Sequence, residues 1–224
     1  MAQAVIECCQ VTKSYFRGDQ EISVLRDFNL SVPAGQFLAI MGPSGSGKTT
    51  ILNLIAGLDR PTYGTIRTAG IDVSQQREAA LAPWRARHIG FVFQFYNLIP
   101  VLTAAENVEL PLLLSPLTKQ ERLKRVQVAL GLVGLGDRLH HYPRQLSGGQ
   151  EQRVGIARAI VSDPTILLAD EPTGNLDREA AQAVMALLSR LHQELNKTIV
   201  MVTHDPRAAE YAQTVIHFDK GRVT

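Results

Sequence analysis

Cysteine is scarce in this 224-residue sequence, which has only two, adjacent at Cys8 and Cys9. Neighbouring thiols cannot supply a disulfide framework, and without a second pair they make a poor metal site. We therefore expect both thiols to stay reduced, as is usual for proteins of reducing compartments. The residues around them form no basic, apolar leader, so the sequence predicts no targeting segment.

Long apolar runs and an excess of one charge are also missing. The most apolar stretch, residues 108–117, is interrupted by Glu109, Pro111 and Pro116 and is too short to span a membrane. With 23 Lys and Arg against 21 Asp and Glu, the formal net charge is +2, so there is no electrostatic reason to expect a nucleic acid partner. Tandem repeats and low-complexity tracts are absent. The length suits one large α/β domain with a sizeable core.

What the sequence does contain is a glycine-rich octapeptide, Gly42-Pro43-Ser44-Gly45-Ser46-Gly47-Lys48-Thr49, which fits the phosphate-binding pattern G-x-x-x-x-G-K-[ST]. An apolar run of strand length, residues 37–41, precedes it, and a helical pattern begins at Thr50. Glycines let backbone N–H groups point at phosphate oxygens, and the helix N-terminus adds partial positive charge. Lys48 can reach the outer phosphates, and the Thr49 hydroxyl can ligate Mg²⁺.

Polar side chains follow three further apolar runs of strand length: Gln94 after residues 89–93, Asp170 and Glu171 after 165–169, and His204 close after 198–202. Two carboxylates at the end of a buried strand are costly unless they serve a cation or a reaction. Asp170 suits Mg²⁺, and Glu171 is a candidate general base for an attacking water. Gln94 and His204 are weak signals alone, but the carboxyl ends of strands in an open α/β sheet meet at the ligand-binding edge.

Two predicted helix starts carry further candidates. Ser147 and Gln150 fit a capping box, so a structural role can explain that pair. Gly148 and Gly149 between them are not needed for a cap, and they also build an exposed, anion-binding N-terminus. Asp177 is expected to be the N-cap of the helix that follows it.

Two segments leave alternatives open. Tyr15 could stack on a nucleotide base, but spacing alone favours a tyrosine that packs in a β-sheet. Residues 95–117 are too apolar for a free loop and too often broken by proline for one helix; a surface that packs on a partner and a subdomain core fit equally well.

Residues 74–88 are polar, and Trp84 among them is expected to pack in the core. Elsewhere the patterns predict short strands and turns over residues 1–35, helices over 119–135 and 207–213, and a terminal hairpin over 215–223.

Together and in this order, the motifs resemble those of the ATP-binding subunits of ABC transporters across essentially the whole chain. The matching motifs are the phosphate loop, the Q-loop glutamine Gln94, the signature at 146–150, the Walker B strand ending at Asp170-Glu171, the D-loop at 175–177 and the switch histidine His204. Residues 89–94, 97–100, 103–108 and 171–177 are similar to the subgroup of lipoprotein-releasing and macrolide-exporting ATPases and, more distantly, to the cell-division ATPase.

The resemblance implies an α/β fold: a RecA-like P-loop NTPase core with an antiparallel β subdomain and an α-helical subdomain. The chain would form a single domain over residues 1–224, with the helical subdomain inserted at about residues 95–162. No regulatory domain would follow the last hairpin.

The resemblance also implies an ATPase that uses ATP and Mg²⁺ as an ATP-dependent homodimer. The phosphate loop of one copy would be completed by the signature of the other, through Ser147, Gly148, Gly149 and Gln150, and Asp177 would join the dimer contact. Tyr15 would stack on adenine, although its spacing alone favours packing in a β-sheet. Thr49, Gln94 and Asp170 would hold Mg²⁺, Glu171 would polarise the attacking water, and His204 and Gln94 would sense the γ-phosphate.

The implied partners are integral membrane permease subunits that contact the region Gln94–Leu114, with the chain at the cytoplasmic side of the inner membrane. An exporting or lipoprotein-extracting machine, a regulatory ATPase that signals through a membrane partner and an importer are the alternatives. A DNA- or ribosome-directed ATPase is disfavoured because a coiled-coil insertion, a second cassette and a basic excess are absent. Glu151 departs from the family pattern, and its carboxylate would either repel the phosphates modestly or have no effect.

Overall fold

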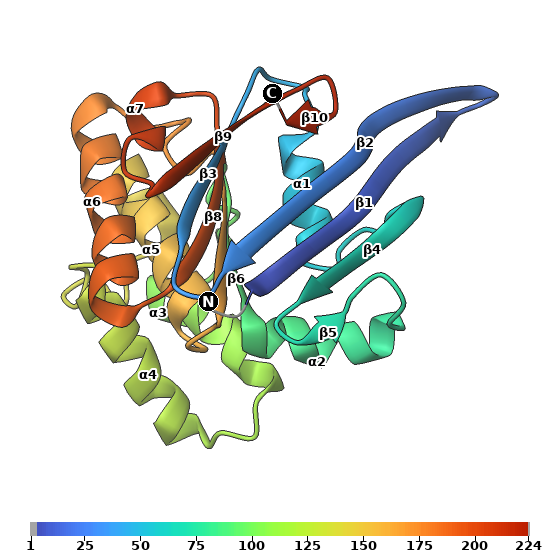
Figure 1. Ribbon diagram of the computed structural model, residues 1–224. Coiled ribbons are helices and arrows are strands. Elements are labelled where there is room, and N and C mark those ends of the chain that lie inside the picture. Colours follow the sequence, from blue (N-terminus) through green and yellow to red (C-terminus); the bar gives the residue numbers. More distant parts are fainter. Residues whose placement is uncertain (1–3, 224) are drawn as a thin grey trace.

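The computed structural model describes residues 4–223 as two β-sheets with helices around them (Figure 1). Residues 1–3 and 224 of the expected domain lie outside the described residues. The larger sheet has the strand order β10-β9-β3-β8-β7-β6, and the smaller sheet has the order β2-β1-β4-β5. The larger sheet contains β3 (Phe37–Met41), β6 (Ile89–Val92), β7 (Ile166–Asp170), β8 (Thr198–Thr203), β9 (Thr214–Asp219) and β10 (Arg222–Val223). The smaller, antiparallel sheet contains β1 (Ala4–Arg17), β2 (Gln20–Pro33), β4 (Tyr63–Thr68) and β5 (Ile71–Asp72).

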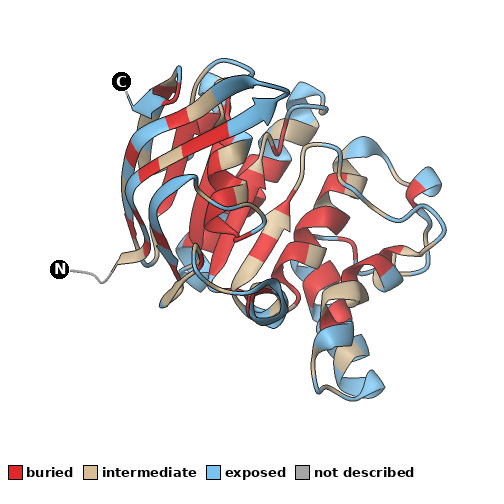
Figure 2. Cartoon of the chain, turned by 90° about the vertical axis from the view of Figure 1, so that its right-hand side faces the viewer, coloured by how far each residue is buried: buried red, intermediate tan, exposed pale blue. Residues whose placement is uncertain are grey.

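The three central strands of the larger sheet, β3, β8 and β7, are parallel and are buried on both faces (Figure 2). Because successive side chains of a strand point to opposite faces, each strand contributes to two separate cores. In β3, Phe37 and Ala39 belong to one core, whereas Leu38 and Ile40 belong to the other. The same alternation holds along β7 and β8. Near-continuous apolar runs are what a parallel sheet covered on both faces requires.

Helices cover one face, and the smaller sheet with two helices covers the other. The helices are α1 (Lys48–Ile55), α2 (Glu78–His88), α3 (Ala104–Glu109), α4 (Lys119–Leu132), α5 (Gly148–Ile160), α6 (Arg178–Leu195), α7 (Pro206–Ala209) and the 3₁₀ turns η1 (Leu110–Leu114) and η2 (Pro143–Gln145). The first core lies between the larger sheet and α3, α4, α5, α6 and α7. The second lies between the two sheets and includes α1 and α2. Among residues 4–223, no helix is both long enough and apolar enough to cross a membrane.

The predicted helix caps are confirmed. The Ser147 hydroxyl accepts a hydrogen bond from the Gln150 backbone, and the Gln150 side chain accepts one from the Ser147 backbone. Asp177 caps α6 by accepting from the backbone N–H of Ala180 at 2.8 Å. Such caps satisfy backbone donors that have no partner within the helix.

Other expectations need correction. Residues 74–88, which the sequence predicted only as a polar segment, contain helix α2. Trp84 in this helix is buried, as expected. The short strands expected over residues 1–35 are instead two long paired strands whose register shifts at several points. The helix expected over 207–213 is only the short α7, and the expected helix 119–135 ends at Leu132.

Candidate functional site

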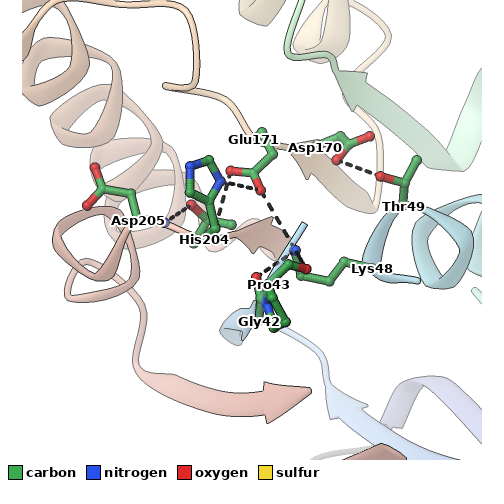
Figure 3. Close-up of polar contacts among 9 residues, drawn as sticks. Gly42, Pro43, Lys48, Thr49, Asp170, Glu171, His204 and Asp205 are labelled. Carbon is green, nitrogen blue, oxygen red and sulfur yellow. Dashed lines mark hydrogen bonds and ion pairs between the residues drawn. The ribbon is translucent and has the colours of Figure 1, made fainter. Parts of the chain in front are cut away.

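The carboxyl ends of β3, β7 and β8 meet at one edge of the larger sheet and carry most of the predicted site (Figure 3). Met41 lies opposite Thr203, and Asp170 lies opposite Val202. The strand ends are therefore level, which brings the phosphate loop, Asp170, Glu171 and His204 together. This is the edge at which open α/β sheets bind their ligands.

The phosphate loop connects β3 to α1 and depends on glycine where the backbone is crowded. A Cβ on Gly42 would lie 2.0 Å from the carbonyl oxygen of Phe218. Gly47 has a φ of 104°, and a Cβ there would lie 2.6 Å from Cγ1 of Val24. A side chain at either position would displace the loop, and a left-handed φ further favours glycine.

Unused hydrogen-bonding groups line this loop. Ser46 Oγ is buried and has no hydrogen-bond partner among residues 4–223. Gly47, at the N-cap of α1, provides no side-chain cap, and the first turn of α1 contains no acidic residue. Buried polar groups are normally paired, and a helix N-terminus attracts anions. The loop therefore fits a phosphate group.

Lys48 is buried and is held at the loop. Its Nζ donates hydrogen bonds to the carbonyl oxygens of Gly42 at 2.7 Å and Pro43 at 2.8 Å. It also lies 4.0 Å from Oε1 of Glu171. Burial lowers the pKa of Lys48, and the nearby carboxylates of Glu171 and Asp170 oppose that shift. The ammonium is thus a positioned cation that can exchange these carbonyls for phosphate oxygens.

Glu171 is oriented by the end of β8. Its backbone N–H donates to the carbonyl of Val202 at 3.0 Å, and its φ of 45° is unusual for a residue other than glycine. Nδ1 of His204 lies 2.9 Å from Oε1 of Glu171, and the His204 backbone N–H donates to Oε2 at 3.3 Å. A cavity of about 630 Å³ opens beside both residues, between α6 and α7. A fixed carboxylate beside a cavity can accept a proton from water.

Thr49 and Asp170 form the second pair at this edge. The Thr49 hydroxyl donates to Oδ1 of Asp170 at 3.1 Å. A hydroxyl and a carboxylate are oxygen ligands of the kind that Mg²⁺ takes together with phosphate oxygens. Burial raises the pKa of Asp170, and the Glu171 charge adds to this, while the Thr49 hydrogen bond and Lys48 oppose it.

Replacing Asp170 with asparagine should stabilise the free protein at neutral pH. A raised folded-state pKa means that the fold binds the proton more tightly than the unfolded chain, so ionised Asp170 opposes folding once the pH exceeds its pKa. The substituted amide lacks that charge, so the rise in Tm over wild type should be largest near pH 7 and shrink as the pH falls toward about 4. Thermal melts without nucleotide or Mg²⁺ measure this.

Asp205→Asn is a control that should change Tm in the opposite direction. A hydrogen bond from Arg207 outweighs burial and lowers the pKa of Asp205, so Asp205→Asn should lower Tm at neutral pH. A Tm change for Asp170→Asn that did not depend on pH would contradict the prediction.

Gln94 adjoins Gly174, three residues after Glu171, and Tyr15 adjoins Asp59, in the turn that follows α1. The Gln94 carbonyl accepts a hydrogen bond from Nδ2 of Asn175 at 2.9 Å. The Gln94 side chain packs closely on Gly174, because a Cβ on Gly174 would lie 2.9 Å from Nε2 of Gln94. Tyr15, on β1, is partly exposed and donates its hydroxyl to Asp59. Burial and the Asp59 hydrogen bond raise the pKa of Tyr15, and the side chain of Thr50, in the first turn of α1, opposes this shift.

The signature and Asp177 are not joined to the phosphate loop of the same chain. Ser147 and Gly148 are exposed at the start of α5. Within residues 4–223, no side-chain hydrogen bond or ion pair connects residues 147–150 to residues 42–49. The signature instead adjoins α6, because a Cβ on Gly149 would lie 2.9 Å from Cβ of Ala180.

Glu151, the departure from the family pattern, is half-buried, and burial raises its pKa. Its charge adds to the effect of burial in raising the pKa of Tyr96. The carboxylate therefore lies toward the segment after Gln94.

Two residues of this region, Arg158 and Gln152, are not predicted by the sequence patterns. Arg158, on α5, donates to the carbonyls of Asn97 at 2.6 Å and Tyr96 at 2.7 Å. Gln152 is fully buried and donates to the Pro172 carbonyl at 2.6 Å. A glutamine on the buried face of a helix is a signal that could have identified Gln152, whereas no motif marks Arg158.

Residues 25–174 match the family described as ABC transporter. The lipoprotein-releasing system ATP-binding protein LolD of Chromohalobacter salexigens is 45% identical over 222 residues, covering 99% of this chain and 94% of LolD. The macrolide export ATP-binding/permease protein MacB of Salmonella typhimurium is 45% identical over 220 residues, which are 98% of this chain but 34% of MacB.

A solved structure is also similar. It is the dimeric structure of a post-hydrolysis state of the ATP-binding cassette MJ0796 bound to ADP and Pi. The two chains superpose with a TM-score of 0.90 at 44% sequence identity, over 97% of this chain and 96% of the cassette.

Proposed function

The chain belongs to the ABC transporter family as an ATP-hydrolysing, ATP-binding subunit, and from that membership we propose that it powers an exporter or a lipoprotein-extracting machine. The single observation that carries this finer proposal is the similarity to LolD, which extends over nearly the full length of both chains. The match to the ATPase part of a macrolide exporter supports the same direction of transport.

In the proposed mechanism, the loop from Gly42 to Thr49 binds the ATP phosphates. Lys48 exchanges its two carbonyl partners for phosphate oxygens, and Ser46 Oγ and the first N–H groups of α1 gain acceptors. We further propose that Thr49, Asp170 and Gln94 hold the Mg²⁺ that arrives with ATP. When bound, Mg²⁺ supplies charge neutralisation at the β- and γ-phosphates.

Glu171 then orients a water molecule and accepts its proton. His204 holds both oxygens of the Glu171 carboxylate, one near Nδ1 and the other through its backbone N–H, and each oxygen keeps a lone pair that can face the water. Gln94 and His204 border the position expected for the γ-phosphate, and Tyr15 offers its ring to the base.

We propose that the complete site forms between two copies in an ATP-dependent homodimer. Ser147, Gly148, Gly149 and Gln150 of the second copy would close over the phosphates, because the signature is exposed and does not bond to its own loop. Asp177, at the start of α6, would lie in the dimer contact. The dimeric state of the MJ0796 cassette supports this arrangement.

The permease is expected to dock on the region Gln94–Leu114. Several large apolar side chains of this region are exposed: Phe95, Ile99, Val101, Leu113 and Leu114. A cluster of exposed apolar side chains is typical of an interaction surface. We propose that the chain acts as one domain over residues 1–224, with a helical subdomain at 95–162 that carries this surface, at the cytoplasmic side of the inner membrane.

The proposed function is tested with the Glu171→Gln variant. We expect the tagged variant, extracted from membranes with ATP and Mg²⁺, to co-purify with a permease of few spans and a large extracytoplasmic domain. A permease with many spans and a solute-binding protein would contradict export. A stable soluble dimer without any membrane protein would contradict the transporter role.

A further inference from the structure

Tyr15 belongs to a compact polar cluster with Asp59 and Lys13. The Tyr15 hydroxyl donates to Oδ2 of Asp59 at 2.6 Å. Lys13 Nζ donates to Oδ1 of Asp59, also at 2.6 Å, and to the Arg60 carbonyl at 2.8 Å. One carboxylate therefore holds both side chains, each with its own oxygen.

Asp59 is fixed relative to both α1 and β1. It lies in the turn that follows α1, where its backbone N–H donates to the carbonyl of Asn53. Three residues later, Thr62 donates to the Thr12 carbonyl at 2.8 Å and accepts from the Ser14 backbone at 3.0 Å. The turn thus links the end of the phosphate-loop helix to the strand that carries Tyr15.

The charge state of Asp59 suits this role. Burial opposes its ionisation, but hydrogen bonds from Lys13, Tyr15 and the Arg60 backbone outweigh burial and hold its pKa below the ordinary value. The ionised carboxylate is the stronger acceptor for both neighbours.

The cluster also leaves only one face of the tyrosine ring available. Lys13 Nζ lies over the ring, 4.6 Å from its centroid, and Lys13 itself is 8% exposed. A cation at this position interacts favourably with the ring and occupies that face. Tyr15 as a whole remains 41% exposed.

We propose that Asp59 is a positioning residue for the nucleotide base. Asp59 holds the Tyr15 ring against the phosphate-loop helix, and Lys13 covers one face, so that the base stacks on the other. This inference rests on the proposed function, because it assumes that ATP binds with its phosphates at residues 42–49.

The test compares two ligands that share the phosphates but differ in the base. Affinities of the full-length protein for ATP and for inorganic tripolyphosphate are measured by calorimetry with EDTA present to prevent turnover. Asp59→Asn should weaken ATP binding by about three- to tenfold, which is part of what a base gains from stacking on an aromatic ring. Tripolyphosphate binding should not change, because that ligand has no base.

Two further variants separate positioning from a general effect on folding. Asp163→Asn is the control, because Asp163 forms an ion pair of similar length with Lys197, at 2.5 Å, on a more exposed side chain in another part of the fold. It should leave both affinities unchanged. Tyr15→Ala combined with Asp59→Asn should bind ATP no more weakly than Tyr15→Ala alone, since Asp59 acts through the ring.

Each remaining outcome contradicts the inference. Equal weakening for ATP and tripolyphosphate would assign Asp59 to the structure of the phosphate loop. An unchanged ATP affinity would show that Tyr15 needs no support from Asp59. If the wild-type protein bound ATP no more tightly than tripolyphosphate, the proposed stacking of the base on Tyr15 would be wrong. If it bound neither ligand, the proposed function itself would be wrong.

Discussion

Glu171→Gln should reduce steady-state ATP hydrolysis by about two to four orders of magnitude, the usual contribution of general base catalysis. Glutamine keeps one oxygen, which can accept one of the two His204 hydrogen bonds, but it cannot take a proton from water. ATP affinity should change little, because Glu171 lies 4.0 Å from Lys48 and its loss removes only a long ion pair. Phosphate release measures turnover, and calorimetry measures binding.

The variant should also accumulate as a dimer with ATP, because bound ATP is no longer consumed. Size-exclusion chromatography with ATP and Mg²⁺ tests this. Glu210→Gln is the matched control: Glu210 lines the same cavity of about 630 Å³ and should leave turnover unchanged. Near-normal hydrolysis by Glu171→Gln would show that another group accepts the proton.

Lys48→Ala should weaken ATP binding by about ten- to a hundredfold. A hydrogen bond to a charged group contributes about 1.5–3 kcal/mol, and about 1.4 kcal/mol corresponds to tenfold in affinity. Lys48 is buried at the phosphate loop, so solvent does not replace the missing ammonium. Calorimetric titration with ATP gives the affinity directly.

A Lys48→Arg variant distinguishes charge from geometry. Arginine keeps the charge, but its larger planar head cannot repeat the two contacts of Nζ with Gly42 and Pro43. We expect an intermediate affinity. Equal affinities for wild type and Lys48→Ala would remove Lys48 from the phosphate site.

The centre of the site could be predicted because its signals are local in the sequence. The octapeptide specifies a strand, a loop and a helix in order, and Asp170 and Glu171 follow a strand that is apolar throughout. Because the strands are parallel, their carboxyl ends lie at the same edge of the sheet, so the loop and the two carboxylates come together. The roles assigned to Gln94, His204 and Tyr15 remain predictions until the variants are measured.

The rest depends on contacts between distant residues. Asp59 meets Tyr15 across 44 positions of sequence, and nothing near either residue marks the pair. The alternation of β1 and β2 is broken by register shifts around Cys8, Val11 and Lys13, which hid two long strands. Helix α2 has little apolar periodicity and contains Pro83, so its tertiary contacts decide its structure.

The alternation of β3, β7 and β8 between two cores has a consequence for how such chains can vary in length. One residue inserted into β7 would exchange the partners of Leu167 and Leu168 and, in the same step, move Asp170 and Glu171 out of line with the phosphate loop. An insertion in the exposed turn between β1 and β2 has neither effect. Evolutionary insertions and deletions should therefore collect at the hairpin tips and in surface loops, while the three central strands keep a constant length.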